Sequence, residues 1–436
     1  MMGNVPKLRV AICGGGIGGL IHACALSKFS SISTNIYESA SQLSMFGAGI
    51  GMWPRTWGIL EAMGLADDMK KVSLHFPAYD ETLAFTFRKS DQIKGVEFLK
   101  MRGRGNLSTF HRGHFQQTML DHLSPNCGLY YSKRLHSYSR NADGSLQLYF
   151  QDGSAAACDV LVGADGLKSA TRSCMLLEHA SVARSEGRPS AHIEECIDPE
   201  YSGWTAYRSL IPVDALEQTF GGITLPRHPV VYTGRNAFIL AYPVSFGQMV
   251  NLVVFSLKEE LKGLELSRSL ERNITSFDNW ESEAKAWLKL IYNPTKWAIH
   301  TVKPLSSYVF RNVALLGDAA HGCTPHQGTG AGQAIEPSFL VIQAQPRDTI
   351  PRVLSIYDSI RRPWTQELAE RARINGQCLA LHLDDLDFEN SPSNIVAHNL
   401  HKLGGVLVDN WKWAWETDAR KMLHRAIERL EGKGVS

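Results

Sequence analysis

Three glycines near the N-terminus have the spacing of a phosphate-binding turn. Gly14, Gly16 and Gly19 form GxGxxG directly after the apolar run LRVAIC (8–13) and before a helical pattern. The first glycine permits a tight turn, the second lets the backbone approach a pyrophosphate, and the third lets the helix pack closely on the strand. Free N–H groups at the start of the helix would then face the phosphates. The pattern predicts a dinucleotide-binding site.

An acidic residue stands where a ribose would need it. Glu38 belongs to the second β-rich run, TNIYES (34–39), and lies 19 residues after Gly19. Its carboxylate could accept two hydrogen bonds from the diol of an adenosine ribose. A 2′-phosphorylated ribose is disfavoured here because like charges repel. The alternative is a glycine-rich turn with Glu38 on a solvated strand end.

Later glycine turns indicate that the ligand extends further along the protein. GADG (163–166) and GDAAH (317–321) place Asp165 and Asp318 where a carboxylate could meet ribityl or ribose hydroxyls. GTGAG (328–332) opens a helix whose N–H groups could stabilise negative charge on the pyrimidine end of a flavin. Gly and Asp are common in loops, so each motif alone is weak evidence. Together with the first turn they predict one extended ligand that crosses the domain.

The elements that must position these residues have an α/β order. Strand, glycine turn, helix and strand follow one another at the N-terminus, which predicts a βαβ unit. Residues 54–72 have a helical pattern that begins at Pro54, and VALLGD (313–318) returns as a buried strand. Between them, strand-like runs predominate from about 177 to 300, and the remainder after 350 is mostly amphipathic helix.

We therefore expect an α/β fold with a Rossmann-like FAD-binding domain, an inserted β-rich substrate domain and a C-terminal helical region. The expected segments are 1–176 for the first part of the FAD-binding domain, 177–300 for the substrate domain, 301–350 for the return segment and 351–436 for the C-terminal helices.

Composition and charge exclude several classes of partner. Lys and Arg number 45 against 43 Asp and Glu, so the net charge of +2 does not favour nucleic acid. No run of about 18 apolar residues predicts a transmembrane span, and no signal peptide is apparent. The eight cysteines include no CxxC pair, which disfavours a structural zinc site and fits a reducing compartment. We expect a cytoplasmic protein without a metal centre.

Four motifs carry a resemblance to a known family. GGGIGG with Glu38, GAGIGMWP (47–54), GADGLKSATR (163–172) and GDAAHGCTPHQGTGAGQAIE (317–336) resemble the FAD-binding motifs of the group A flavoprotein monooxygenases. The similarity is greatest to the salicylate hydroxylase-like branch, which is common in fungi and also contains dearomatising hydroxylases of phenolic polyketides. It covers nearly the whole chain, including WKWAWETDA near the C-terminus.

Two positions depart from the family pattern. Arg55 follows Pro54 where the family usually has Asn, and Pro337 follows Glu336 where it usually has Asp. The first departure could alter the lining of the flavin's re-face, and the second could alter the helix after the flavin loop.

The resemblance implies cofactor-binding residues in every motif: Gly14, Gly16, Gly19, Glu38, Ala48, Gly49, Arg112, Asp165, Asp318, Gly330, Ala331 and Gly332. By this resemblance, the first three glycines hold the FAD pyrophosphate and Glu38 holds the adenosine ribose. Arg112 reaches the phosphate–ribityl region, Asp165 serves both FAD and reduced nicotinamide, and Asp318 contacts the ribityl chain. The last three residues lie beside the isoalloxazine.

Three further residues are candidates for the substrate site. Arg208 and Tyr242 resemble a pair that anchors a phenolate in the dearomatising relatives, and a guanidinium with a phenol can stabilise a phenoxide. The alternatives are an ion-pair role for Arg208 and a core role for Tyr242. His326, beside the flavin loop, could act as a base or a substrate contact, or it could be satisfied by backbone hydrogen bonds.

The activity implied by the resemblance is hydroxylation of a phenol or hydroxybenzoate by FAD, O2 and either NADH or NADPH, through a flavin C4a-hydroperoxide. A carboxylate on the attacked carbon would leave as CO2, whereas an alkyl group there would give a dearomatised dienone. The alternatives are a dearomatising hydroxylase of a phenolic polyketide, an FAD-dependent epoxidase of a prenylated or terpenoid substrate, and a flavin-less binding module of the same fold.

Overall fold

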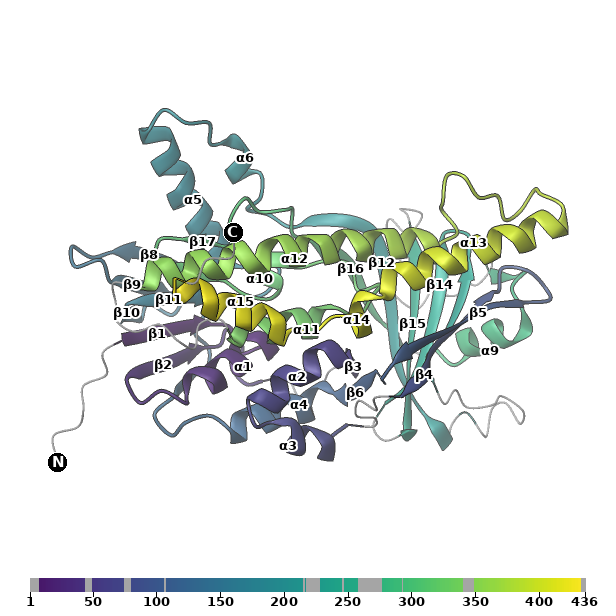
Figure 1. Cartoon of the computed structure of the whole chain (residues 1–436), viewed down its shortest axis with the longest axis horizontal. Helices are drawn as coiled ribbons and strands as arrows, with labels where there is room; N and C mark the ends of the chain where they lie inside the picture. Colours follow the sequence, from purple (N-terminus) through teal and green to yellow (C-terminus); the bar gives the residue numbers. More distant parts are fainter. Residues whose placement is uncertain are drawn as a thin grey trace.

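The computed structural model describes residues 8–43, 49–73, 80–105, 107–214, 216, 228–244, 247–257, 277–291, 293–339 and 349–432. Two large sheets lie side by side, and long C-terminal helices run across both of them (Figure 1). The expected α/β class with a C-terminal helical region is confirmed.

The first large sheet is the predicted Rossmann-like sheet. Its strands are β1 (Leu8–Cys13), β2 (Ile32–Tyr37), β7 (Gly128–Tyr130), β11 (Val160–Gly163), β17 (Val309–Phe310) and β18 (Val313–Leu315), in the order β17-β18-β11-β1-β2-β7. All neighbouring pairs are parallel except β17 and β18. The carboxyl ends of β1, β11 and β18 therefore meet at one edge, which brings three glycine turns of distant sequence together.

The helices of this half connect and cover that sheet. They are α1 (Ile17–Leu26), α2 (Pro54–Ala62), α3 (Ala66–Lys71), α4 (Arg112–Asp121), α5 (Ala170–Ser185), α6 (Ala191–Glu194), α10 (Asp318–His321), α11 (Gly330–Ile335) and the 3-10 helix Glu336–Phe339. The prediction of one helix over 54–72 was wrong, because the chain breaks at Gly64, whose φ is +73°. Few residues other than glycine adopt that conformation, and the helix cannot continue through it.

Two small sheets complete this half. One contains β8 (Leu135–Arg140), β9 (Leu146–Phe150) and β10 (Ala155–Cys158), and the other pairs β3 (Gly49–Met52) with β6 (Ser108–His111). The β3–β6 ribbon matters for the site because Gly49 of β3 contacts a side chain from the second large sheet.

The second large sheet has seven strands in the order β16-β12-β15-β14-β13-β4-β5. They are β4 (Glu81–Lys89), β5 (Val96–Arg104), β12 (Glu200–Pro212), β13 (Val230–Gly234), β14 (Ala237–Val244), β15 (Met249–Leu257) and β16 (Thr295–Thr301). The sheet thus combines strands from the expected segment 177–300 with two strands from 1–176. The segment boundaries stay a prediction.

Alternation along these strands gives the seven-stranded sheet two apolar faces. One face packs against α9 (Ser282–Lys289), with Trp287 at its centre. The other carries Phe238, Val253 and Phe255 and packs against the C-terminal helices. Because side chains alternate between faces, every second residue of β12, β14 and β15 faces the same interior space.

The C-terminal helices join the two halves. They are α12 (Ile350–Leu379), α13 (Ser393–Trp411), α14 (Trp413–Glu416) and α15 (Arg420–Leu430). The first turns of α12 pack in the core around the parallel sheet, and its last turns pack against the seven-stranded sheet. Within the described parts of the chain, no helix combines the length and the apolarity that crossing a membrane requires.

Candidate active site

The first glycine turn has the geometry that its spacing predicts. Gly14 has a φ of +109°, and a Cβ there would lie 2.2 Å from the Ala164 carbonyl oxygen. A Cβ on Gly19 would lie 2.0 Å from the Gly14 oxygen, so these two glycines allow close packing of backbone on backbone. A Cβ on Gly16 would meet nothing within 4 Å. Open space therefore lies at the N-terminus of α1, where a pyrophosphate fits.

Glu38 lies beside this turn, at the carboxyl end of β2. One carboxylate oxygen accepts a hydrogen bond from the Gly15 N–H at 2.7 Å, and the other accepts one from the Ala40 N–H at 2.7 Å. The second of these oxygens also accepts from the Ser39 hydroxyl at 3.2 Å, so the oxygen bonded to Gly15 is the one that keeps a lone pair for a ligand hydroxyl. The position fits the predicted ribose contact.

Asp165 holds its own loop together. Both of its oxygens are used at the start of α5, where they accept hydrogen bonds from the Ser169 hydroxyl and from the Thr171 N–H and hydroxyl. Ser169 in turn caps the helix by accepting from the Arg172 N–H at 2.8 Å. This arrangement favours a shaping role for Asp165 over a direct contact with ligand hydroxyls.

Arg172 is a residue of this region that sequence reasoning missed. Its fully buried guanidinium donates to the carbonyl oxygens of Leu167, Ile197 and Ala319. Ala319 belongs to the GDAAH motif, so Arg172 ties the second glycine turn to the third. The signal was the final arginine of GADGLKSATR, which no local pattern marks as a connector.

Asp318 and Arg112 converge although they lie far apart in the sequence. Asp318 opens α10, directly after Gly317, whose φ is +60°. The side chain of Asp318 is accessible, yet the surrounding protein displaces water and raises the pKa of its carboxyl. The nearby Arg112 guanidinium acts against that rise. An acid and a cation together suit the polar chain between a flavin and its phosphates.

The last glycine turn begins α11 next to the same edge. Gly330 and Ala331 border a cavity, and a Cβ on Gly330 would meet nothing within 4 Å. A Cβ on Gly332 would instead lie 2.7 Å from the Thr56 hydroxyl, so this glycine lets α11 pack on α2. Ala48 lies outside the described residues.

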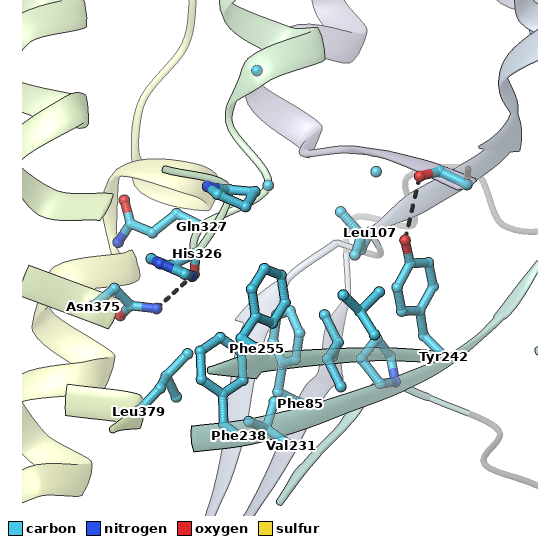
Figure 2. A pocket seen from close by; sticks show the side chains of 18 of the residues that line it. Phe85, Leu107, Val231, Phe238, Tyr242, Phe255, His326, Gln327, Asn375 and Leu379 are labelled. Carbon is cyan, nitrogen blue, oxygen red and sulfur yellow. Dashed lines mark hydrogen bonds between the residues drawn. The ribbon is translucent and has the colours of Figure 1, made fainter. Parts of the chain in front are cut away.

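The cavity has a volume of about 210 Å³ and lies against the seven-stranded sheet (Figure 2). Its walls are mostly apolar and include Phe85, Val231, Phe238, Phe255, Leu379 and Trp411. A cavity of about 150 Å³ is large enough to hold benzene. A substituted aromatic ring therefore fits beside the Gly330–Ala331 turn.

Arg208 and Tyr242 both line this cavity. Arg208 has no ion pair with any residue that the structure describes, and its Nε–H has no partner there. Tyr242 donates a hydrogen bond to the Gly49 oxygen at 3.3 Å, which joins the two halves of the protein (Figure 2). Burial raises the pKa of Tyr242, and the charge of Arg208 opposes that rise.

His326 also lines the cavity and is only 5% exposed. Neither ring nitrogen has a hydrogen-bond partner within the described chain, which favours a ligand contact over a histidine satisfied by the backbone. Burial lowers the pKa of the imidazole to about 3. The ring is therefore neutral near pH 7. It packs edge-on against Trp204, with the two ring centroids 4.6 Å apart.

Hydrogen bonds from side chains of the C-terminal helices hold the backbone at His326 in place. The Asn375 side-chain amide donates to the His326 oxygen at 2.7 Å and accepts from the Trp411 indole at 3.1 Å. Gln327 accepts from the Trp53 indole at its carbonyl and donates its amide to the Asn410 oxygen. The tryptophan-rich C-terminus thus forms part of the cavity wall.

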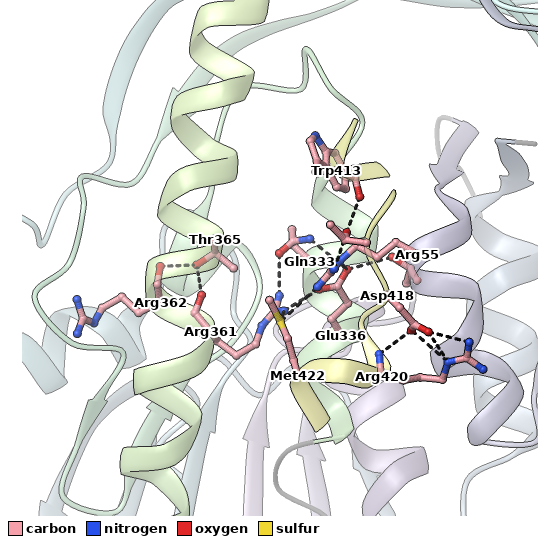
Figure 3. A network of polar contacts seen from close by, with 12 residues as sticks. Arg55, Gln333, Glu336, Arg361, Arg362, Thr365, Trp413, Asp418, Arg420 and Met422 are labelled. Carbon is pink, nitrogen blue, oxygen red and sulfur yellow. Dashed lines mark hydrogen bonds and ion pairs between the residues drawn. The ribbon is translucent and has the colours of Figure 1, made fainter. Parts of the chain in front are cut away.

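Arg55, one of the two departures from the family pattern, contacts Glu336, the residue that precedes the other departure, Pro337. Arg55 pairs with Glu336 at 3.0 Å, and Arg361 pairs with the same carboxylate at 2.6 Å (Figure 3). All three side chains are at most 2% exposed. Burial would raise the pKa of Glu336, but the two guanidinium groups outweigh it and lower that pKa. The cluster fixes the end of α11 against α2 and α12.

Comparison with known proteins agrees with this architecture. Residues 7–193 match the family described as FAD binding domain. The chain is 31% identical to a salicylate hydroxylase of Pseudomonas putida over 96% of this chain and 94% of that protein. It is 30% identical to the FAD-dependent monooxygenase str9 of Strobilurus tenacellus over 98% and 99% of the two chains. A solved salicylate hydroxylase substrate complex superposes with a TM-score of 0.77 at 25% identity, over 97% and 98% of the chains.

The fold and the glycine turns therefore define a flavoprotein oxidoreductase that binds FAD. The chain belongs to the FAD-dependent aromatic monooxygenases, in the branch that includes salicylate hydroxylase. The alternative of a flavin-less binding module is set aside, because the FAD binding domain family and the monooxygenase relatives both match this chain.

Proposed function

We propose that the protein uses NADH or NADPH and O2 to hydroxylate a phenol or hydroxybenzoate bound in the cavity beside Gly330 and Ala331. The observation that carries this proposal is the pairing of Arg208 and Tyr242 on an otherwise apolar wall. Among the described residues Arg208 has no carboxylate partner, and a partly buried cation on an apolar wall favours an anionic ligand because an unpaired charge away from water is disfavoured. A phenolate or a benzoate carboxylate meets that requirement.

We assign the binding of FAD to the residues gathered at the carboxyl edge of the parallel sheet. Gly14, Gly16 and the N-terminus of α1 would take the pyrophosphate, and Glu38 the adenosine ribose. Arg112 and Asp318 would take the polar chain toward the flavin, and Gly330 to Gly332 the ring. Bound FAD supplies the electron transfer from nicotinamide and the activation of oxygen.

The chain's own contribution is to bind, orient and shield the substrate. Arg208 would hold the substrate anion, and Tyr242 would donate a hydrogen bond to it. The aromatic walls would fix the ring plane and exclude water, since water in the site would divert activated oxygen to hydrogen peroxide. The neutral imidazole of His326 would give a hydrogen bond to a polar substituent, or take one from it.

The names of the relatives support a hydroxybenzoate as the substrate class. Where the attacked carbon carries a carboxylate, that group leaves as CO2 and the ring gains a hydroxyl. The lining supports this reaction over epoxidation of a neutral terpenoid, which would not need Arg208. A cytosolic location is part of the proposal, and the eight cysteines, all of them free, support it.

The test is substrate-stimulated oxidation of reduced nicotinamide. Purified protein loaded with FAD is mixed with NADH or NADPH and a panel of hydroxybenzoates, and products are identified by mass. We expect at least one phenol to accelerate oxidation and to gain one oxygen atom. A panel without any stimulation or product contradicts the proposal.

The cofactor assignment has its own test. Asp318→Ala removes the carboxylate at the start of α10. We expect the variant to retain less FAD after gel filtration, because FAD loses the hydrogen bonds, about one to three in number, that it would make with this carboxylate. Flavin content is read from absorbance. Occupancy equal to that of the wild type would show that Asp318 is misassigned.

A further inference from the structure

Asn251 lies next to the anion-binding pair, although no motif marks it. It stands on β15 directly opposite Tyr242 of β14, and Arg208 of β12 is opposite Val253, two residues further along. Val253 lines the cavity. Since side chains two apart on a strand share a face, Asn251 points to the same side as both members of the pair.

The side chain of Asn251 is completely buried and unsatisfied. It is 0% exposed, and neither its amide nitrogen nor its oxygen has a hydrogen-bond partner in the described part of the chain. Burial raises the pKa of Tyr242, while Arg208 and Asn251 both oppose the rise. Asn251 therefore lies close to the hydroxyl, although the contact lacks hydrogen-bond geometry. Buried amides without partners destabilise a folded protein and are uncommon.

The unused groups of the three residues complement one another. Among the described residues, the Arg208 Nε–H donor and both the acceptor and the donor of the Asn251 amide have no hydrogen-bond partner. The oxygen of Tyr242 can accept as well as donate. The Asn251 oxygen matches the Arg208 Nε–H, and the Asn251 N–H matches the Tyr242 oxygen.

We propose that Asn251 is a positioning residue that ties Arg208 and Tyr242 into one anion-binding unit when a phenolate occupies the cavity. This inference rests on the proposed function. Asn251 accepts from Arg208 and donates to the Tyr242 oxygen, so that the Tyr242 O–H leaves Gly49 and turns to the ligand anion. Each hydrogen bond in such a chain polarises the next, which strengthens the contact with the anion.

A second buried asparagine provides a matched control. Asn375 is also 0% exposed, but its side chain is bonded to the His326 oxygen and to the Trp411 indole. Leucine replaces either asparagine at similar size. Asn375→Leu breaks existing hydrogen bonds, whereas Asn251→Leu removes atoms that have no hydrogen-bond partner in the part of the chain that the structure describes.

The experiment compares Asn251→Leu with Asn375→Leu in the FAD-loaded protein. We expect the unfolding midpoint of Asn251→Leu to be unchanged or higher, and that of Asn375→Leu to be clearly lower. The probe ligand is salicylate, or the hydroxybenzoate that binds the wild type best, titrated against flavin absorbance. We expect its dissociation constant to rise about fivefold to tenfold in Asn251→Leu, as the loss of about one net hydrogen bond implies.

A double-mutant cycle with Tyr242→Phe separates positioning from simple packing. In the Tyr242→Phe background, we expect Asn251→Leu to change the dissociation constant by no more than about twofold. Three results would each overturn the inference. The first is that the effects of Asn251→Leu and Tyr242→Phe on the dissociation constant multiply in the double variant. The others are an unchanged dissociation constant in Asn251→Leu and an unfolding midpoint of Asn251→Leu that is lowered as far as that of Asn375→Leu. If the wild type binds no hydroxybenzoate, the proposed function fails as well; if it binds and Asn251→Leu binds equally, the inference alone fails.

Discussion

The cluster around Glu336 and the wall around Asn251 are both buried, but they treat polar groups in opposite ways. Glu336 accepts hydrogen bonds from Arg55, Thr56, Gln333 and Arg361 (Figure 3). Asn251 has no hydrogen bond with any described residue, and the Arg208 Nε–H and both nitrogens of His326 are also unbonded.

The difference indicates which groups hold the fold and which await a ligand. Bonded polar groups fix elements relative to one another, as Glu336 does for α2, α11 and α12. Unbonded ones reduce stability and are retained where a ligand completes them. The bonded groups around Glu336 belong to α2, α11 and α12, whereas the unbonded groups of Arg208 and His326 line the cavity.

The largest expected effect comes from breaking the bonded cluster. Glu336→Gln keeps the shape but leaves two buried guanidinium groups without a counter-charge, so we expect a loss of about 3–5 kcal/mol of unfolding free energy. Urea denaturation measures it. The control is Glu370→Gln, whose ion pair with Arg373 is more than half exposed and should contribute less than about 1 kcal/mol. Equal losses in the two variants would contradict the distinction.

A smaller loss of unfolding free energy is expected when Arg172, which connects the second and third glycine turns, is replaced. Arg172→Lys keeps the charge but cannot reach three carbonyl oxygens, so we expect a loss of about 1–3 kcal/mol together with weaker FAD retention. Arg184→Lys, on the same helix but largely exposed, is the control. If the Arg172 variant retains FAD as the wild type does, the turns are held by other contacts.

The smallest change in unfolding free energy near neutral pH is expected from replacing His326, whose ring has no hydrogen-bond partner among the described residues. His326→Leu removes an imidazole without hydrogen bonds, so stability at pH 8 should change by less than about 1 kcal/mol. The folded pKa of about 3 lies below the unfolded value, so the wild type loses stability as pH falls below about 6.5. This loss reaches about 2 kcal/mol at pH 5 and should be absent in the variant. Parallel pH dependence of the two proteins would contradict the neutral, buried state of His326.

The sequence predicted the features that depend on local geometry. Gly14 and Gly19 could be placed because a tight turn followed by close helix packing needs glycine at fixed spacing, and the structure has both contacts. Arg208 and Tyr242 were brought together through a family resemblance, and they do line one cavity.

Features that depend on pairing between distant segments could not be predicted. β4 and β5 join the seven-stranded sheet through β13, and nothing in their own alternation identifies that partner. Arg55 and Glu336 lie 281 residues apart, so no local pattern indicates that they form one buried ion pair. Asn251 is a single polar residue in the apolar run VNLVVF, and only the strand register places it beside Tyr242.

The most direct test of the account separates cofactor binding from substrate binding in one variant, Arg208→Ala. FAD content and the dissociation constant of the best-binding hydroxybenzoate are measured on the same preparation. We expect one FAD per chain, as in the wild type, and a dissociation constant raised at least about tenfold, with stimulated nicotinamide oxidation lost or diverted to peroxide. Undiminished hydroxybenzoate binding in a fully flavinylated variant would show that the anion is held elsewhere.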